Sequence, residues 1–191
     1  MRLFRQHPLS FDVAPLLRQI DAAPELWNAH PWRTAGETSP HREAPDIWVR
    51  FRALGELTRP NHGNEQHIST WYPAIEKLSE VRPIARRLMH HLHGVTLGGI
   101  LITKVPPRKR VYAHHDRGRW HAEYFNSKTY VVLRSNPACV NRAWSDPTSP
   151  LPEDVYMRAG EAWGFDNQVA HEVVNDGPTD RISLIVCARV E

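Results

Sequence analysis

Short apolar segments fill the second half of the chain. They are rich in β-branched and aromatic residues, and stretches of Pro, Gly, Asn, Asp and Ser separate them. From Val95 onward they read VTLGGILITKV, RVYAH, KTYVVLRS, CVNRAW, AWGFD, AHEVV and RISLIVCARV. Such regular punctuation is typical of an all-β sandwich or barrel. The pattern predicts a mainly β fold, a jelly roll in which two sheets face one interior.

The first half of the chain contains two helical patterns instead. One helix is expected over residues 13–20, with Asp12 as its N-cap. A second is expected through residues 74–92 after a cap at Thr70, and Pro83 is expected to kink or split it. The jelly roll is therefore predicted to have flanking N-terminal helices.

Two further segments complete the N-terminal region. Residues 47–51 alternate as IWVRF and predict a strand, while residues 28–45 are rich in Pro, His, Arg, Ser and Thr and predict a loop long enough to act as a lid. We expect residues 1–191 to form a single domain. In it, residues 1–94 supply the helical, loop and lid region and residues 95–191 the jelly-roll catalytic core.

Composition narrows the classes of function. The chain has 191 residues, 41% of them hydrophobic, which is enough for a substantial core. Its 24 basic residues are scattered among 21 acidic ones, so a nucleic-acid partner is not supported. Cys139 and Cys187 stand in apolar contexts that suit a reducing cytoplasm, the expected location. No apolar run is long enough for a membrane span, and nothing in the sequence specifies an oligomeric state.

One ordered set of polar residues indicates a metal site. His114, His115 and Asp116 are consecutive, and His171 and Arg181 follow much later in the chain. In a strand, alternation places His114 and Asp116 on one face and His115 on the other. Alone, the triplet also fits a solvated turn, and His171 also fits an ordinary core or surface histidine. Together, two imidazoles and a carboxylate form the facial triad of non-heme Fe(II) oxygenases, and an arginine suits the carboxylate of a co-substrate.

These residues carry a resemblance to a known family. Residues 160–186, GEAWGFDNQVAHEVVNDGPTDRISLIV, resemble the pattern of the aspartyl/asparaginyl β-hydroxylases, which are 2-oxoglutarate/Fe(II)-dependent oxygenases with a cupin-type double-stranded β-helix. Residues 100–116, ILITKVPPRKRVYAHHD, are similar to the family strand with a hydroxyl residue eleven positions before the first metal histidine; here it is Thr103. The chain looks like a short bacterial or phage-type member.

The resemblance implies a ligand for each part of the site. It gives His114 and His171 as iron ligands, and Asp116 departs from the glycine of vertebrate-type members towards a three-ligand triad. It also implies that several residues bind the co-substrate 2-oxoglutarate. These are Arg181 and Ser183 at the distal carboxylate, with Thr103, Lys128 and Tyr130 around it.

The resemblance further implies a reaction. With Fe(II), 2-oxoglutarate and O2, the enzyme would hydroxylate an unactivated C–H bond, on the β-carbon, of an amino acid or of a residue in a peptide or protein. Several side chains are expected near the entrance of the active site, where they could bind such a substrate: Arg33, His41, Trp48, Arg50, Arg119 and Asn167. Two alternatives remain open: another cupin metalloenzyme that does not use 2-oxoglutarate, and a non-catalytic jelly roll that binds a ligand.

Overall fold

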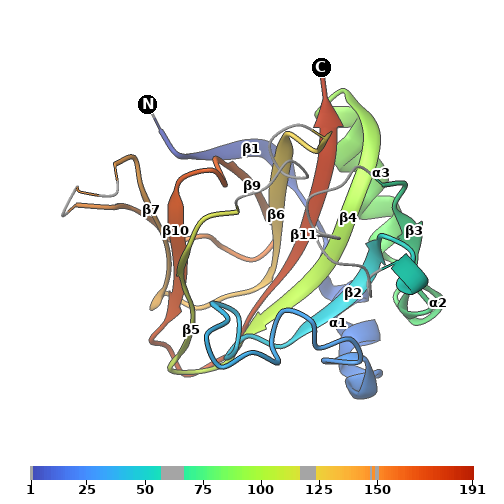
Figure 1. Cartoon of the computed structure of the whole chain (residues 1–191), viewed down its shortest axis with the longest axis horizontal. Helices are drawn as coiled ribbons and strands as arrows, with labels where there is room; N and C mark the ends of the chain where they lie inside the picture. Colours follow the sequence, from blue (N-terminus) through green and yellow to red (C-terminus); the bar gives the residue numbers. More distant parts are fainter. Residues whose placement is uncertain (1, 57–66, 117–123, 147, 149–150) are drawn as a thin grey trace.

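Two antiparallel β-sheets face each other and form the framework of the protein (Figure 1). The structure is a computed structural model that describes residues 2–56, 67–116, 124–146, 148 and 151–191. The larger sheet has seven strands in the order β1-β9-β6-β11-β4-β2-β3. Their bounds are β1 Phe4–Ser10, β2 Asp46–Phe51, β3 Thr70–Trp71, β4 Gly94–Val105, β6 Ser127–Arg134, β9 Glu161–Phe165 and β11 Arg181–Val190.

The smaller sheet has four strands in the order β5-β10-β7-β8. Their bounds are β5 Lys109–His114, β7 Cys139–Trp144, β8 Glu153–Val155 and β10 Ala170–Asn175. All seven segments expected to be strands after Val95 are strands, and the predicted mainly β jelly roll is confirmed. The strand expected at residues 47–51 is also present, as β2.

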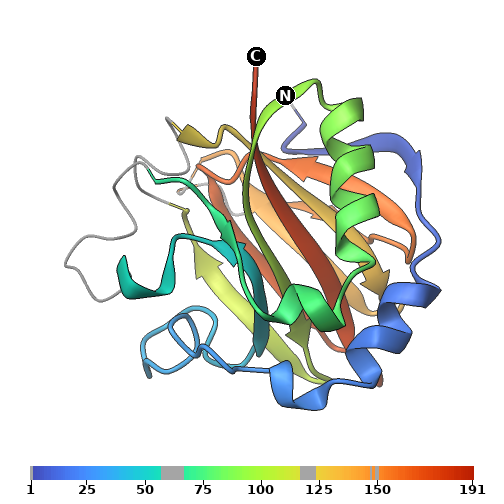
Figure 2. The same ribbon diagram turned by 90° about the vertical axis from the view of Figure 1, so that its right-hand side faces the viewer.

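Helices cover the outer face of the larger sheet, the face turned away from the smaller sheet (Figure 2). They are α1 (Ala14–Asp21), α2 (Ala74–Lys77) and α3 (Val81–His91), and short 3₁₀ turns occur at Pro24–Leu26 and Leu54–Glu56. The main apolar cluster lies between these helices and the sheet. It joins Leu16 and Leu88 of the helices and Leu78, which follows α2, to Ile102 of β4 and Leu184 of β11, all fully buried. No helix in the described part of the chain is long and apolar enough to cross a membrane.

The helix boundaries correct three details of the sequence prediction. Thr70 is not a helix cap; it belongs to β3, and α2 follows Pro73. The second helical segment is divided, but the break falls at residues 78–80, before Pro83, which lies in the first turn of α3. Proline is tolerated there because its missing N–H has no intrahelical partner in the first turn. The N-cap of α1 is Val13 rather than the expected Asp12, although Asp12 Oδ1 accepts a hydrogen bond from the N–H of Ala14, the first helical residue, at 3.1 Å.

The three strands missing from the prediction are β1, β3 and β8. Each lies at the edge of a sheet. In β1 only Phe4 is buried, and Pro8 stands where the register with β9 shifts, between His7 and Ser10. Edge strands tolerate proline and exposed side chains, so they lack the apolar, β-branched character that identified the central strands.

Residues 28–45 form the expected loop between α1 and β2. Its two ends are tied together at the base, because the Asn28 N–H donates to the Asp46 carbonyl at 2.8 Å and the Asp46 N–H donates to Asn28 Oδ1 at 3.1 Å. The loop contributes Arg33 and His41 to the lining of the cavity described next.

Candidate active site

His114, Asp116 and His171 meet at the interior side of the smaller sheet. Strands β5 and β10 are neighbours, and His114 and His171 are partners in their register. Asp116 follows just after β5. One potential ligand atom from each residue lies within 4.8 Å of the others, and His114 Nε2 is 3.7 Å from Asp116 Oδ1. The structure therefore brings together the three residues predicted to bind a metal.

The two imidazoles are oriented by backbone carbonyl groups. The Nδ1–H of His114 donates to the Tyr112 carbonyl at 2.7 Å, and the Nδ1–H of His171 donates to the Val169 carbonyl at 2.9 Å. A histidine with its Nδ1 protonated has an Nε2 lone pair available for a metal, and such carbonyl bonds are the usual support for metal-binding histidines. Within the described residues, both buried Nε2 atoms have no hydrogen-bond partner. The residues present therefore fit a divalent metal.

Both histidines are held in the neutral form that a metal requires. Burial lowers the pKa of His114, and burial lowers the pKa of His171 to about 3, with the nearby Lys128 charge adding to the effect. Because desolvation disfavours the charged imidazolium, no proton competes for Nε2 at neutral pH.

Asp116 is oriented from its other oxygen. Its Oδ2 accepts hydrogen bonds from the Lys128 ammonium and from Asn167 Nδ2, the latter at 3.2 Å. Burial acts to lower the pKa of Lys128, but the charge and hydrogen bond of Asp116, together with Tyr130 and Cys187, outweigh this effect and the pKa is raised. Oδ2 is thus occupied by donors, while Oδ1 faces His114. Lys128, predicted to contact the co-substrate, lines the cavity but has its ammonium on this carboxylate.

A second polar group lies deeper in the same cavity, on the larger sheet. Arg181 begins β11 and is only 3% exposed; Ser183 is the next residue on that face and pairs in register with Thr103 of β4. One Arg181 NH2 group contacts Met157 Sδ at 3.7 Å. In the part of the chain that the structure describes, the buried Arg181 Nε and Thr103 Oγ1 have no partner. Burial lowers the pKa of Arg181, although arginine keeps its charge, so this guanidinium fits an anion.

Tyr130 and Asn141 complete the lining between the two polar groups. Tyr130, on β6, stacks on Phe165 with ring centroids 4.7 Å apart, and burial raises its pKa. Asn141 comes from β7 in the opposite sheet, and the sequence analysis missed it. A signal was present: in CVNRAW, alternation places Asn141 on one face with Cys139 and Ala143, so an amide interrupts a series of small buried residues.

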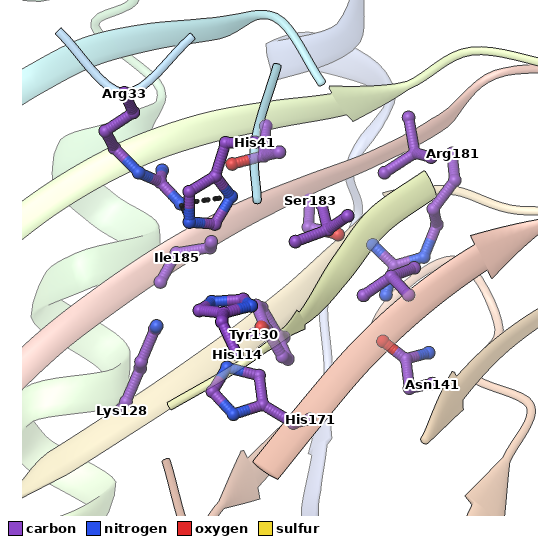
Figure 3. Close-up of a pocket in the computed structure, with 14 residues that line it drawn as sticks. Arg33, His41, His114, Lys128, Tyr130, Asn141, His171, Arg181, Ser183 and Ile185 are labelled. Carbon is purple, nitrogen blue, oxygen red and sulfur yellow. Dashed lines mark hydrogen bonds between the residues drawn. The ribbon is translucent and has the colours of Figure 1, made fainter. Parts of the chain in front are cut away.

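Arg33 and His41 line the cavity beside the metal-ligand residues (Figure 3). The His41 ring lies edge-on to His114 with centroids 4.7 Å apart, and burial places the His41 pKa well below its usual value. The Arg33 guanidinium is 2.8 Å from His41 Nε2 and 3.4 Å from Asp46 Oδ2. Both loop residues are therefore close enough to meet a substrate at the metal.

The other predicted substrate residues occupy different places. Trp48 packs against Phe51 and Tyr72, and the Arg50 guanidinium lies over the Trp71 ring; neither residue is among those that line the cavity. Asn167 contacts Asp116 as described above. Arg119 lies outside the described residues.

Comparison with known proteins identifies the family. The sequence profile described as "Aspartyl/Asparaginyl beta-hydroxylase" matches residues 32–189, most of the chain. The chain belongs to the aspartyl/asparaginyl β-hydroxylase family. This confirms the resemblance, and it makes the protein an enzyme of the 2-oxoglutarate/Fe(II) oxygenase class, a hydroxylase. No curated protein matches the sequence of this family member.

Solved structures similar to this β-hydroxylase family member share its fold. A 2-oxoglutarate/Fe(II) oxygenase family protein from Burkholderia pseudomallei has a TM-score of 0.60 at 16% identity, over 97% of this chain and 84% of its own. A prolyl-4-hydroxylase from Pseudomonas putida has a TM-score of 0.58 at 17% identity, over 100% and 94%. A prolyl hydroxylase from Trichoplax adhaerens, in complex with a peptide fragment, has a TM-score of 0.59 at 13% identity, over 97% and 83%.

Proposed function

We propose that this protein is a dioxygenase that uses Fe(II), 2-oxoglutarate and O2 to hydroxylate an unactivated C–H bond, at the β-carbon, of an amino acid or of a residue in a peptide. One observation carries the proposal. Among the described residues, a single cavity contains two unpartnered imidazole nitrogens beside a carboxylate and, on the larger sheet, a buried guanidinium for which no carboxylate partner is found. In the overall reaction, substrate C–H, O2 and 2-oxoglutarate give substrate C–OH, succinate and CO2.

His114, Asp116 and His171 would hold the iron. Bound Fe(II) would supply the O2 activation and the oxidative decarboxylation, leaving ligand positions for co-substrate and O2. The chain's own residues then have to fix the ligand geometry. The carbonyl groups of Tyr112 and Val169 orient the two rings, and Lys128 with Asn167 orients the Asp116 carboxylate through Oδ2.

Arg181 would bind the C5 carboxylate of 2-oxoglutarate through its planar fork, which matches the two carboxylate oxygens. Ser183 and Thr103 lie side by side on neighbouring strands and would add hydroxyl donors to the same carboxylate. The Tyr130 phenol lines the cavity between this end and the metal, and we assign it to the bound co-substrate as well. Ordered this way, the co-substrate spans the cavity from Arg181 to the iron.

The substrate would enter beside Arg33 and His41. A cationic side chain next to the metal favours a substrate that carries a carboxylate, such as a free amino acid or an acidic peptide. A peptide substrate is also compatible with the fold, since the Trichoplax relative was solved with a peptide. We propose that the whole chain acts as a single domain, with residues 28–45 as the lid over residues 95–191.

The first experiment measures succinate formation from 2-oxoglutarate with Fe(II), ascorbate and O2, without substrate and then with amino acids and acidic peptides. Arg181→Ala should raise the 2-oxoglutarate concentration needed for half-maximal turnover by about a hundredfold, since a buried charge-assisted interaction is lost. Arg142→Ala is the matched control. Arg142 is also on a central strand, but its guanidinium pairs with Asp154 outside the cavity, at 2.9 Å.

The result separates the alternatives. Turnover that depends on 2-oxoglutarate and on Arg181, but not on Arg142, supports the proposal. If the iron-loaded wild type forms no succinate with any substrate, the proposal is wrong. The protein would then be a cupin enzyme that does not use 2-oxoglutarate, or a binding protein. A cupin enzyme without 2-oxoglutarate would not need Arg181, whose buried Nε has no partner among the described residues.

A further inference from the structure

Asn141 is a buried amide that no described residue hydrogen-bonds. It is 1% exposed, and neither its Nδ2 nor its Oδ1 has a hydrogen-bond partner among the residues described. It lies in the middle of β7, where neighbouring Arg142 points outward to Asp154 and Asn141 points into the cavity. Buried side-chain amides in folded proteins almost always have partners, so this one requires an explanation.

The surrounding fold gives Asn141 no structural role. Its register partners are Val173 on β10 and Val155 on β8, both apolar, and the ladder between these strands uses only backbone groups. A leucine or valine would fill the space without burying an unpaired amide, which is unfavourable. The amide is therefore better explained by a polar ligand than by packing.

Its position identifies the ligand chemistry. Figure 3 shows Asn141 projecting from the strand opposite Arg181, with its amide below the guanidinium. Ser183 and Thr103 line the same cavity from the larger sheet. A carboxylate offers about four lone-pair directions, and Arg181 with the two hydroxyls approaches from one sheet only. Asn141 Nδ2 is the donor available from the other sheet.

We propose that Asn141 binds the distal carboxylate of 2-oxoglutarate, opposite Arg181, and thereby makes the enzyme select a keto acid with a second carboxylate. This inference rests on the proposed function and adds a specificity-determining residue to it. The Asn141 amide donates to one carboxylate oxygen while Arg181 binds from the other side. The anion is then held between the two sheets rather than against one of them.

The test compares two ligands and two kinds of readout. Dissociation constants are measured anaerobically on the Fe(II)-loaded protein for 2-oxoglutarate and for 2-oxopentanoate, which lacks the distal carboxylate. Thermal unfolding is measured without ligand. Asn141→Leu should weaken 2-oxoglutarate binding by about ten- to a hundredfold, the loss of one hydrogen bond to a charged group, and leave 2-oxopentanoate binding unchanged. The unfolding temperature should stay constant or rise, because no partner of the amide is lost.

Two further variants keep the test decisive. Asn141→Val, a β-branched residue that suits a strand, replaces the leucine variant if the latter does not fold. Asn126→Leu is the control: the Asn126 amide is bonded to both backbone groups of Val190, at 3.0 and 2.9 Å, so its loss should lower the unfolding temperature and leave ligand preference unaltered.

The outcomes are distinct. Loss of 2-oxoglutarate affinity alone supports the role of Asn141. Equal losses for both keto acids, or a fall in unfolding temperature with ligand preference intact, overturn it and make Asn141 a structural residue. A wild type that does not prefer 2-oxoglutarate over 2-oxopentanoate overturns the proposed function itself, and the inference with it.

Discussion

The two faces of the larger sheet differ in what their side chains do, although the same strands supply both. On β11, Ile182 and Leu184 point towards the helices and are fully buried in the main apolar cluster. Arg181 and Ser183, which alternate with them, point into the cavity and are almost as buried. Because side chains alternate along a strand, every second residue can stabilise the fold while the residues between them serve the site.

The difference lies in how polar groups are satisfied. The face under the helices buries mostly apolar side chains, Ile102 and Val131 among them, with the Thr129 hydroxyl as an exception, and this burial contributes stability in proportion to the apolar area removed from water. The inner face keeps buried polar atoms that have no partner in the described residues, among them Arg181 Nε and Thr103 Oγ1. Such atoms cost stability in the free protein and gain their partners when ligands bind.

The largest expected effect comes from removing a ligand of the metal site. His171→Ala should abolish turnover and weaken Fe(II) binding by more than about a hundredfold, because one of three donors is lost. The free energy of unfolding without metal should fall by no more than about 3 kcal/mol, since the one hydrogen bond of this ring to the described residues is that from Nδ1–H to the Val169 carbonyl. Metal titration and chemical denaturation measure the two quantities.

His115→Ala is the control for that variant. His115 is adjacent to His114, but its Nδ1 is bonded to the Gln168 carbonyl at 3.2 Å, away from the candidate ligands. This variant should keep its iron affinity. Iron bound by His171→Ala as tightly as by the wild type would place the metal elsewhere.

Leu184→Ala tests the opposite face. Truncation of this fully buried leucine should lower the free energy of unfolding by about 2–5 kcal/mol, through lost transfer free energy and a cavity. The folded fraction should bind 2-oxoglutarate as the wild type does, because the side chain points away from the cavity. A changed affinity at a temperature where the variant is folded would show that the two faces are coupled.

Asp46→Asn should change how stability depends on pH. Burial raises the pKa of Asp46 to about 6 from 3.8, although the Arg33 charge opposes this. A raised pKa means that the folded state binds the proton more tightly than the unfolded state does. Protonation of Asp46 therefore stabilises the fold fully below pH 3.8, and this stabilisation is lost as pH rises through 6. Above pH 7 the lost free energy of unfolding approaches about 3 kcal/mol, at 1.36 kcal/mol per pKa unit. The free energy of unfolding of the wild type minus that of Asp46→Asn, measured from pH 4 to 8, should fall by about that amount. A difference that does not change with pH contradicts the prediction.

The central strands could be predicted because they are apolar segments rich in β-branched residues, and the metal residues because alternation along a strand places His114 and Asp116 on one face. VTLGGILITKV and RISLIVCARV are long, buried on both faces and bounded by turns, and His114 and Asp116 are two residues apart on one strand end. The edge strand β1 could not be predicted, because only Phe4 in it is buried.

Contacts that depend on tertiary structure could not be predicted from the sequence either. Lys128 lies on the strand face that points to the cavity, yet only the fold shows that its ammonium meets Asp116. Trp48 and Arg50 are two residues apart on β2, a spacing that suggested that both face the substrate. In the structure Trp48 packs against Phe51 and Arg50 lies over Trp71, away from the cavity lining. Asn141 was missed because one amide in a short strand resembles any surface residue until the opposite sheet is in place.

The smallest expected effects come from two adjacent residues of β11 that point to opposite faces of the larger sheet. Ser183→Ala should weaken 2-oxoglutarate binding about three- to tenfold, the loss of one neutral hydrogen-bond donor, with little change in unfolding free energy. Ile182→Val should lower the free energy of unfolding by about 0.5–1.5 kcal/mol and leave 2-oxoglutarate affinity unchanged, because it removes one methylene from the helix-covered face. Binding and denaturation measured on both variants and on the double variant should give additive effects. A strong interaction between two residues whose side chains point to opposite faces would mean that the strand itself shifts when the co-substrate binds.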